Sequence, residues 1–140
     1  MPVLDSCHHQ ISRALRRDGW TIADKPKYIG DAETEIFVYI DIEAFRDPNG
    51  SPLETRTIYV EVKCFPRKNV TQEIYIALGQ YLIYRALLEK QAIAVPLFLA
   101  VPQPIYEATF NTVFRKALHD SGIMMIVVDL ETETIVQWIK

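Results

Sequence analysis

Long hydrophobic runs are missing from this sequence. No stretch of about 18 uninterrupted apolar residues occurs, so we expect no membrane-spanning helix. The first residues, MPVLDSCHHQ, lack the charged-then-apolar pattern of a secretion signal. We therefore expect a cytoplasmic protein.

Cysteine is scarce as well. Cys7 and Cys64 are the only two cysteines, and their spacing fits no zinc site. They permit at most one disulfide bond. In a reducing compartment we expect both to be free thiols.

An excess of positive charge is also absent. The net charge of -3 argues against a surface coated in positive charge for nucleic acid, although local basic patches remain compatible with it. The chain has 140 residues, of which 49% are hydrophobic and 24% charged. These values predict one globular domain, residues 1–140, with a single core.

Hydrophobic periodicity and turn residues predict helices alternating with strands. Helices are expected at 5–17, from about 69 to 90, and at 105–121. Strands are expected at 20–22, 35–42, 57–65, 95–101, 123–128 and 134–139, with a loop at 47–52. Strands joined through helices imply partly parallel pairing. The predicted class is therefore α/β, with a mixed sheet flanked by helices.

The long helix at about 69–90 is apolar nearly all round. Such a helix is either sandwiched in the core or shared with another subunit. We therefore expect a homodimer or a higher oligomer.

Charged residues interrupt two of the predicted strands. Alternation places Glu61 and Lys63 on one face of the strand 57–65, and a hairpin with 35–42 would bring Asp41 to the same face. Two carboxylates beside a lysine suit Mg²⁺ or Mn²⁺. The metal can orient and acidify a water, while the lysine positions that water or stabilises charge on a phosphate.

A Glu-x-Lys triplet alone is weak evidence, because an exposed antiparallel strand carries such residues for solubility. Polar residues on the long helix strengthen the case for a functional site. Gln80 and Tyr84 stand four residues apart and share a face, and Glu73 lies near that face two turns earlier. They could hydrogen-bond a nucleic-acid backbone or brace the metal ligands. A salt-bridged pocket in a plain oligomeric domain is the alternative.

Two groups of basic residues could meet phosphates. Arg13, Arg16 and Arg17 lie on the first helix, and Arg67 and Lys68 follow the strand 57–65. A solvated face beside a helix C-terminus explains them equally well.

Two adjacent histidines on the first helix suggest a metal. Their side chains point about a third of a turn apart, so they cannot chelate together without a third ligand. We expect a structural or solvent role for His9, whereas His8 remains a candidate for either role.

The order Asp, Glu-x-Lys, Gln-x-x-x-Tyr resembles the PD-(D/E)xK nuclease superfamily, and the last element is like that of its RecB-type branch. A closer similarity is to XisH-type proteins, the controlling factors for excision of the fdxN element in cyanobacteria. It extends over nearly the whole chain, in segments 18–22 (DGWTI), 60–65 (VEVKCF), 77–85 (ALGQYLIYR), 99–102 (LAVP) and 135–139 (IVQWI).

This resemblance implies a restriction-endonuclease-like αβββαβ core. Asp41 and Glu61 would be metal ligands together with the backbone carbonyl of Val62, and Lys63 would be the catalytic lysine. The polar residues of the long helix, Gln80 and Tyr84, would support substrate or ligands. His8 lies where family members also carry a histidine.

The implied role is control of site-specific recombination through an endonuclease-like site, with DNA and a recombination-control protein as partners. A non-catalytic regulatory subunit that keeps the nuclease fold is the alternative. One segment departs from the family, which tends toward Leu-Gly-Ala-Glu after the aspartate, where this chain has IEAF at 42–45. The departure lies in the segment directly after Asp41 and includes Glu43.

Overall fold

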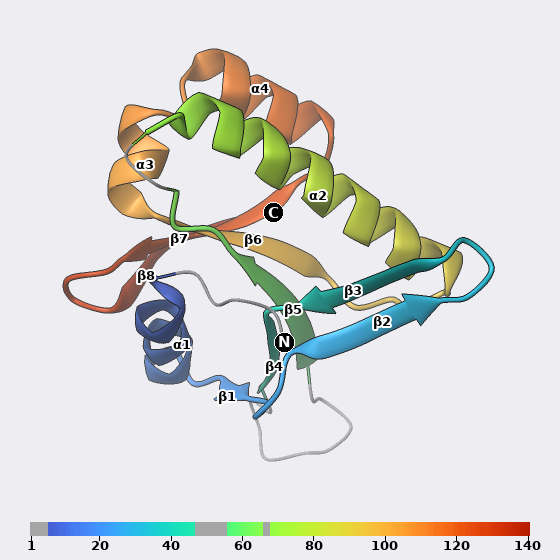
Figure 1. Cartoon of the computed structure of the whole chain (residues 1–140). Coiled ribbons are helices and arrows are strands. Elements are labelled where there is room, and N and C mark those ends of the chain that lie inside the picture. Colours follow the sequence, from blue (N-terminus) through green and yellow to red (C-terminus); the bar gives the residue numbers. More distant parts are fainter. Residues whose placement is uncertain (1–5, 47–55, 66–67) are drawn as a thin grey trace.

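A computed structural model of the chain describes residues 6–46, 56–65 and 68–140. Its elements, shown in Figure 1, are α1 (His8–Arg17), β1 (Thr21–Ile22), β2 (Lys27–Asp31), β3 (Ile36–Ile40), β4 (Ile42–Arg46), β5 (Arg56–Val62), α2 (Val70–Lys90), β6 (Leu97–Pro102), α3 (Gln103–Ala108), α4 (Thr112–Asp120), β7 (Met124–Asp129) and β8 (Thr134–Ile139). The predicted loop at 47–52 lies outside the described residues. None of the described helices is long and apolar enough to cross a membrane.

A curled, mixed sheet of six strands forms the centre, in the order β1-β4-β5-β6-β7-β8. The strands β5, β6 and β7 are parallel, and the other pairs are antiparallel. Parallel neighbours need a crossover connection. Here α2 makes the first, and α3 with α4 makes the second. The predicted α/β class, with a mixed sheet flanked by helices, is confirmed.

Helices cover both faces of this sheet. Figure 1 shows α1 on one side and α2, α3 and α4 on the other. The strand β6 lies between two cores, because Leu99 packs on the α2 side and Phe98 and Ala100 on the α1 side. Every residue of β6 is buried, which confirms the prediction of a central strand.

The single strand predicted at 35–42 is wrong. The chain bends at Asp41, so β3 pairs with β2 in a separate two-stranded sheet while β4 pairs with β5. Ile40 consequently packs in the α2-side core and Ile42 in the α1-side core. An unbroken strand would have placed both on one face. Periodicity did not reveal the break, since each half alternates correctly.

The single helix predicted at 105–121 is also wrong, because α3 and α4 are separate helices. Asn111 begins the second one. Its side-chain oxygen accepts hydrogen bonds from the N–H groups of Val113 and Phe114, at 3.0 and 3.1 Å. Asparagine is a preferred N-cap residue, so the break has a local cause.

The prediction of free thiols is wrong as well. Cys7 and Cys64 form a disulfide bond that joins residues 57 apart in sequence. It connects the start of α1 to the segment after β5, on the sheet face that α1 covers. In the chain-entropy view, closing a loop of this length stabilises the fold by about 4 kcal/mol. The prediction of free thiols was based on an expected reducing compartment. The compartment does not determine whether α1 packs close enough to β5 for the two cysteines to meet.

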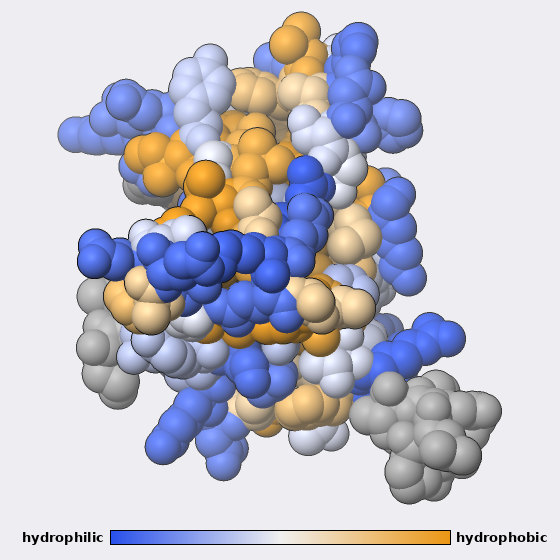
Figure 2. Space-filling view, turned by 90° about the vertical axis from the view of Figure 1, so that its right-hand side faces the viewer, coloured by the Kyte–Doolittle hydropathy of each residue, from blue (hydrophilic) through white to orange (hydrophobic). Residues whose placement is uncertain are grey.

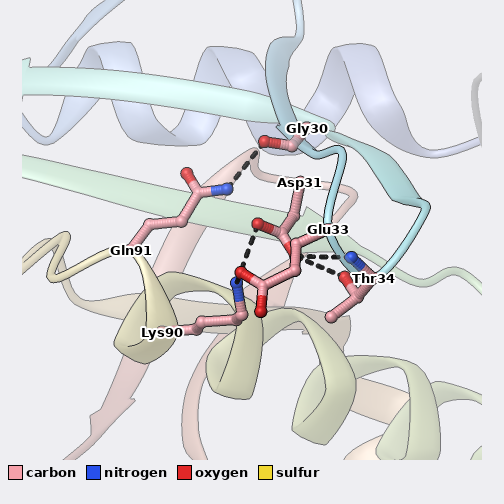
Figure 3. Close-up of polar contacts among 6 residues, drawn as sticks. All are labelled: Gly30, Asp31, Glu33, Thr34, Lys90 and Gln91. Carbon is pink, nitrogen blue, oxygen red and sulfur yellow. Dashed lines mark hydrogen bonds and ion pairs between the residues drawn. The ribbon is translucent and has the colours of Figure 1, made fainter.

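The hairpin of β2 and β3 is fastened to the C-terminal end of α2. The Asp31 carboxylate accepts hydrogen bonds from the backbone N–H and hydroxyl of Thr34 and from Lys90, whose Nζ lies 3.0 Å away. Next to it, Gln91 donates to the carbonyl of Gly30 at 2.7 Å. Figure 3 shows the contact, which comprises Gly30, Asp31, Glu33, Thr34, Lys90 and Gln91.

The groups in this contact shift the pKa values of Asp31 and Lys90. The hydrogen bond from Thr34 and then that from Lys90 hold the pKa of Asp31 below its usual value. The same carboxylate and that of Glu33 raise the pKa of Lys90. A carboxyl group with a lowered native pKa stabilises the fold above its unfolded-state pKa. That stabilisation is lost as the pH falls through the native value.

We predict that Asp31→Asn lowers the free energy of unfolding at neutral pH, because Lys90 loses one of its two charged partners. The difference from wild type should shrink as the pH falls below the unfolded-state pKa of about 4, and vanish below the lowered native pKa, where the wild-type carboxylate is itself protonated. Urea unfolding at neutral and acidic pH measures it. Asp24→Asn, at an exposed bend, is the control and should change little. Equal stability of Asp31→Asn and wild type at neutral pH would contradict the prediction.

Candidate metal centre

Two hydrogen bonds join the bend at Asp41 to the end of β5. The backbone N–H of Val62 donates to Oδ2 of Asp41 at 2.8 Å, and the N–H of Asp41 donates to Oε1 of Glu61 at 3.0 Å. Each carboxylate therefore binds a backbone amide of the other segment. The structure brings together Asp41, Glu61 and the peptide group of Val62.

These two hydrogen bonds form because the chain changes its neighbouring strand at Asp41. The β4–β5 register pairs Ile42 with Val60, so its continuation would pair Ile40 with Val62. Ile40 instead pairs with Lys27 of β2. The amide of Val62 thus loses its partner in the ladder, and the Asp41 side chain takes that place.

The peptide of Val62 faces this bend. Tyr59 and Lys63 donate their N–H groups to β6, to the carbonyls of Pro96 and Ala100. Alternate residues of a strand bond to opposite neighbours, and a residue's N–H and C=O point to the same edge. The Val62 carbonyl therefore points toward Asp41. The family resemblance had assigned a role to this carbonyl, but nothing in the sequence assigned one to the N–H groups of Val62 and Asp41. Side-chain patterns do not show which backbone N–H groups lack a partner in the neighbouring strand.

Glu61 is 4% exposed and Asp41 is half-buried. Glu61 shares its face with Tyr59, which packs in the α2-side core. Burying two carboxylates close together is costly unless hydrogen bonds or a cation compensate. Lys63 follows directly after β5 and is half-buried. By alternation its side chain lies on the face of Glu61.

Gln80 and Tyr84 of α2 lie over this pair. The Gln80 amide nitrogen donates to the Tyr84 hydroxyl at 2.7 Å. Burial raises the pKa of Tyr84, the negative charges of Glu61 and Asp41 raise it further, and the Gln80 bond opposes them. The phenol is therefore close enough to both carboxylates to respond to their charge.

Tyr81 fixes the height of α2 above the sheet. Its buried hydroxyl donates to the Leu97 carbonyl at 2.6 Å and accepts from the Met124 N–H at 3.3 Å. One side chain thus binds α2 to both β6 and β7. This holds the neighbouring Gln80 in place, a positioning role that sequence reasoning did not assign.

The arginines of α1 are mostly engaged within the chain. Arg13 pairs with Glu133 at 2.6 Å, and Arg17 donates to the carbonyl of Thr132 at 2.6 Å. Both contacts fasten α1 to the turn between β7 and β8. Arg16 is exposed in the last turn of α1.

The other candidates lie at or just before the beginnings of α1 and α2, or outside the described residues. Arg67 is not among the described residues, and Lys68 is exposed just before α2. Glu73 is half-buried in the first turn of α2. His8 begins α1, on the opposite side of the sheet from α2, with its ring edge-on to that of His9 at 5.7 Å.

The donor set fits magnesium or manganese better than zinc. Within the described ranges, no group of three or more His, Cys, Asp or Glu side chains could hold a metal ion. Mg²⁺, however, is commonly held by only one or two carboxylates and retains several waters. Asp41, Glu61 and the Val62 carbonyl would supply such a set. A carboxylate offers about four lone-pair positions, so a bond to one amide does not use up its capacity.

The fold and this centre define a small mixed α/β domain with a buried carboxylate pair at the end of a parallel strand. Residues 1–136 match the XisH protein family. The chain belongs to this family, which confirms the closer resemblance noted in the sequence.

Two solved structures are similar over nearly the full length. An XisH family protein from Nostoc punctiforme PCC 73102 has 31% identity and a TM-score of 0.81, covering 97% of this chain and 100% of that chain. An fdxN element excision controlling factor protein from Anabaena variabilis has 32% identity and a TM-score of 0.81, covering 95% and 97%. A comparison with curated proteins finds no match.

The hydrogen bond from Val62 to Asp41 predicts that alanine and asparagine at position 41 change the free energy of unfolding differently. Asp41→Ala should lower the free energy of unfolding by about 1–3 kcal/mol, because the Val62 amide is left unpaired. Asp41→Asn should stay close to wild type, because its side-chain oxygen still accepts that hydrogen bond. Urea unfolding in the presence of a chelator measures both.

Lys63→Ala is the control for this comparison. It should change the stability by no more than about 0.5 kcal/mol, because the half-buried Lys63 side chain makes no hydrogen bond or ion pair with another described residue. If the alanine and asparagine variants at position 41 were equally stable, the Asp41–Val62 bond would have no structural role.

Proposed function

We propose that this chain takes part in controlling the excision of a DNA element. Support comes from its family and from 32% identity, over 95% of its length, to a protein described as an fdxN element excision controlling factor. DNA and a recombination-control protein are the partners this role requires.

We further propose that the centre is of the PD-(D/E)xK type, in a restriction-endonuclease-like αβββαβ core, and hydrolyses phosphodiester bonds. The observation that carries this is the reciprocal bonding of Asp41 and Glu61 across the end of β5. It fixes two oxygen donors beside the Val62 carbonyl, one residue before Lys63. The arrangement holds the donors in place before any ligand binds.

The residues divide the chemistry between them. Asp41, Glu61 and the Val62 carbonyl would hold Mg²⁺ or Mn²⁺, which when bound supplies an oriented, more acidic water. Lys63 orients that water or stabilises the negative charge that develops on the phosphate. The water oxygen would form a bond to phosphorus as the bond to the leaving oxygen breaks, and the proton that the water gives up would be balanced by the one that the leaving oxygen takes up. Tyr84 and its neighbour Gln80 cover the centre on the α2 side.

Exposed basic residues close to the ends of α1 and α2 would meet the DNA backbone. Lys68 and Arg16 are exposed, and Arg67 is adjacent to Lys68 in sequence. Arg13 and Arg17 would contribute through the part of each side chain that stays at the surface. Because the chain carries a net charge of -3, its affinity for DNA should depend strongly on salt.

The test is cleavage of single- and double-stranded DNA by purified protein with Mg²⁺ or Mn²⁺. Glu61→Gln and Lys63→Ala should each reduce the rate by at least about 100-fold, the usual contribution of a positioned catalytic group. Lys116→Ala, on exposed α4, is the matched lysine control and should cut as wild type does. Cutting that survives both site substitutions would overturn the nuclease assignment.

The second candidate function is a non-catalytic regulatory subunit that binds a protein partner. One observation favours it: α2 exposes an apolar stripe on the side facing away from the sheet. Tyr75, Ile76 and Ile83 are more than half exposed, and Leu82 is 37% exposed. Figure 2 shows hydrophobic surface gathered above the hydrophilic band at the hairpin tip. Exposed apolar patches of this kind mark interaction surfaces.

If this stripe joins two copies of the chain, wild-type protein should sediment as a dimer or larger species. The double substitution Ile76→Glu and Ile83→Glu should then give a monomer, because each charge would be buried without a partner. Gln137→Glu, exposed on β8, adds charge elsewhere and serves as the control. A wild-type monomer at high concentration would contradict self-association through α2.

A further inference from the structure

A hollow of about 500 Å³ lies at the opposite end of β5 from the carboxylate pair. Arg56, the first residue of β5, lines it, whereas Val62 ends that strand. Ile58 and Phe98 form part of its floor and belong to the α1-side core. The sheet therefore lies between the hollow and Glu61, and Arg56 at its rim stands about 20 Å along the strand from Val62. Its volume is that of an ordinary small-molecule site.

Aromatic rings form the wall of this hollow. The rings of Trp20 and Trp138 lie 6.1 Å apart, and Phe98 meets Trp138 edge-on at 5.2 Å. The Arg46 guanidinium lies over the ring of Trp20, 4.7 Å from its centroid. These contacts hold the indoles in fixed positions. Trp20 is buried beneath Arg46, so the half-buried Trp138 is the ring that can stack with a ligand.

Positive side chains border the same wall. Arg46 and Arg56 stand directly opposite each other in the β4–β5 register, an arrangement of like charges that destabilises a sheet. Asp18 balances only Arg46, at 3.0 Å. Arg56 is exposed and makes no ion pair with another described residue. Lys140 adds a third positive charge, with its Nζ 5.8 Å from the Trp138 centroid.

The hollow is thus lined by three positive side chains and one carboxylate in a chain whose net charge is -3. Because the chain as a whole is acidic, positive charge gathered at this hollow indicates a site for a particular anion rather than a general attraction to anions. The unfavourable pairing of Arg46 with Arg56 is relieved if an anion binds between them. An anion with a flat ring would pair with the positive side chains and stack on the indole wall.

We propose that this hollow binds a nucleoside phosphate. The base stacks on the indole wall beside Trp138, and the phosphate binds between Arg46 and Arg56, with Lys140 as the third positive charge. Stacking on aromatic rings accepts any base, and arginine binds phosphate through two parallel hydrogen bonds. The nucleotide comes either from solution or from a single-stranded stretch of DNA. The site is independent of the proposed nuclease centre.

The chain contains only two tryptophans, and both line the hollow, so its tryptophan fluorescence reports on this site alone. The experiment titrates the full chain, in the presence of a chelator, with a nucleoside 5′-monophosphate and with a short single-stranded oligonucleotide. Free tryptophan derivative corrects for absorption by the bases. We expect saturable quenching by one or both ligands. Tighter binding of the mononucleotide indicates a free nucleotide, and tighter binding of the oligonucleotide indicates a DNA strand.

Arg56→Gln should weaken binding about tenfold, as loss of one charge-assisted hydrogen bond does. Because Arg56 is exposed, this variant should fold, and Lys140→Gln offers a second, independent test. Lys116→Gln removes one positive charge from α4, on the other side of the sheet, and should leave binding unchanged.

Three results would overturn the proposal. The first is no quenching by either ligand at millimolar concentration. The second is quenching that neither Arg56→Gln nor Lys140→Gln weakens. The third is equal affinity for inorganic phosphate or for duplex DNA, since neither can stack a base on the indoles.

Discussion

The chain passes from one hydrophobic core to the other at Asp41, and two hydrogen bonds make that passage possible. The sheet loses its regular ladder there, because β3 leaves to join β2. The carboxylates of Asp41 and Glu61 bind the backbone amides at the break. Without them a buried amide would be left unpaired at the centre of the molecule, which costs about 1–3 kcal/mol. The candidate centre is thus also the joint between the two halves of the fold.

The segment that carries Lys63 is fixed from both faces of the sheet. Its backbone continues the bonding to β6 through Ala100. On the α1 side, the next residue is bound covalently to Cys7. On the other side, Tyr81 holds α2 against β6 and β7, and Lys90 fastens the far end of that helix to the hairpin. The backbone that carries Lys63 is thus fixed before any phosphate meets the side chain, as the proposed catalysis by positioning requires.

Local patterns were enough to predict β5, because alternation depends only on neighbouring residues. Glu61 occupies the face expected for it, and the bonding pattern continues through Lys63. The break at Asp41 was not predictable from periodicity, since only the choice of pairing partner separates β3 from β4. The bond between Cys7 and Cys64 depends on how α1 packs against the sheet, a long-range contact that no local pattern encodes. The XisH family resemblance, in contrast, lay in short segments spread along the chain and was confirmed.

The structural role of the carboxylates has a consequence for how such chains evolve. Selection for folding alone would retain a side-chain hydrogen-bond acceptor at positions 41 and 61, which an amide supplies as well as an acid. Lys63 is under no such constraint, because its side chain makes no hydrogen bond or ion pair with another described residue. Among relatives, loss of the lysine with both acceptors kept would therefore mark a lineage in which the domain survives as a scaffold. The lysine, together with the negative charge at positions 41 and 61, is what reports on the proposed chemistry.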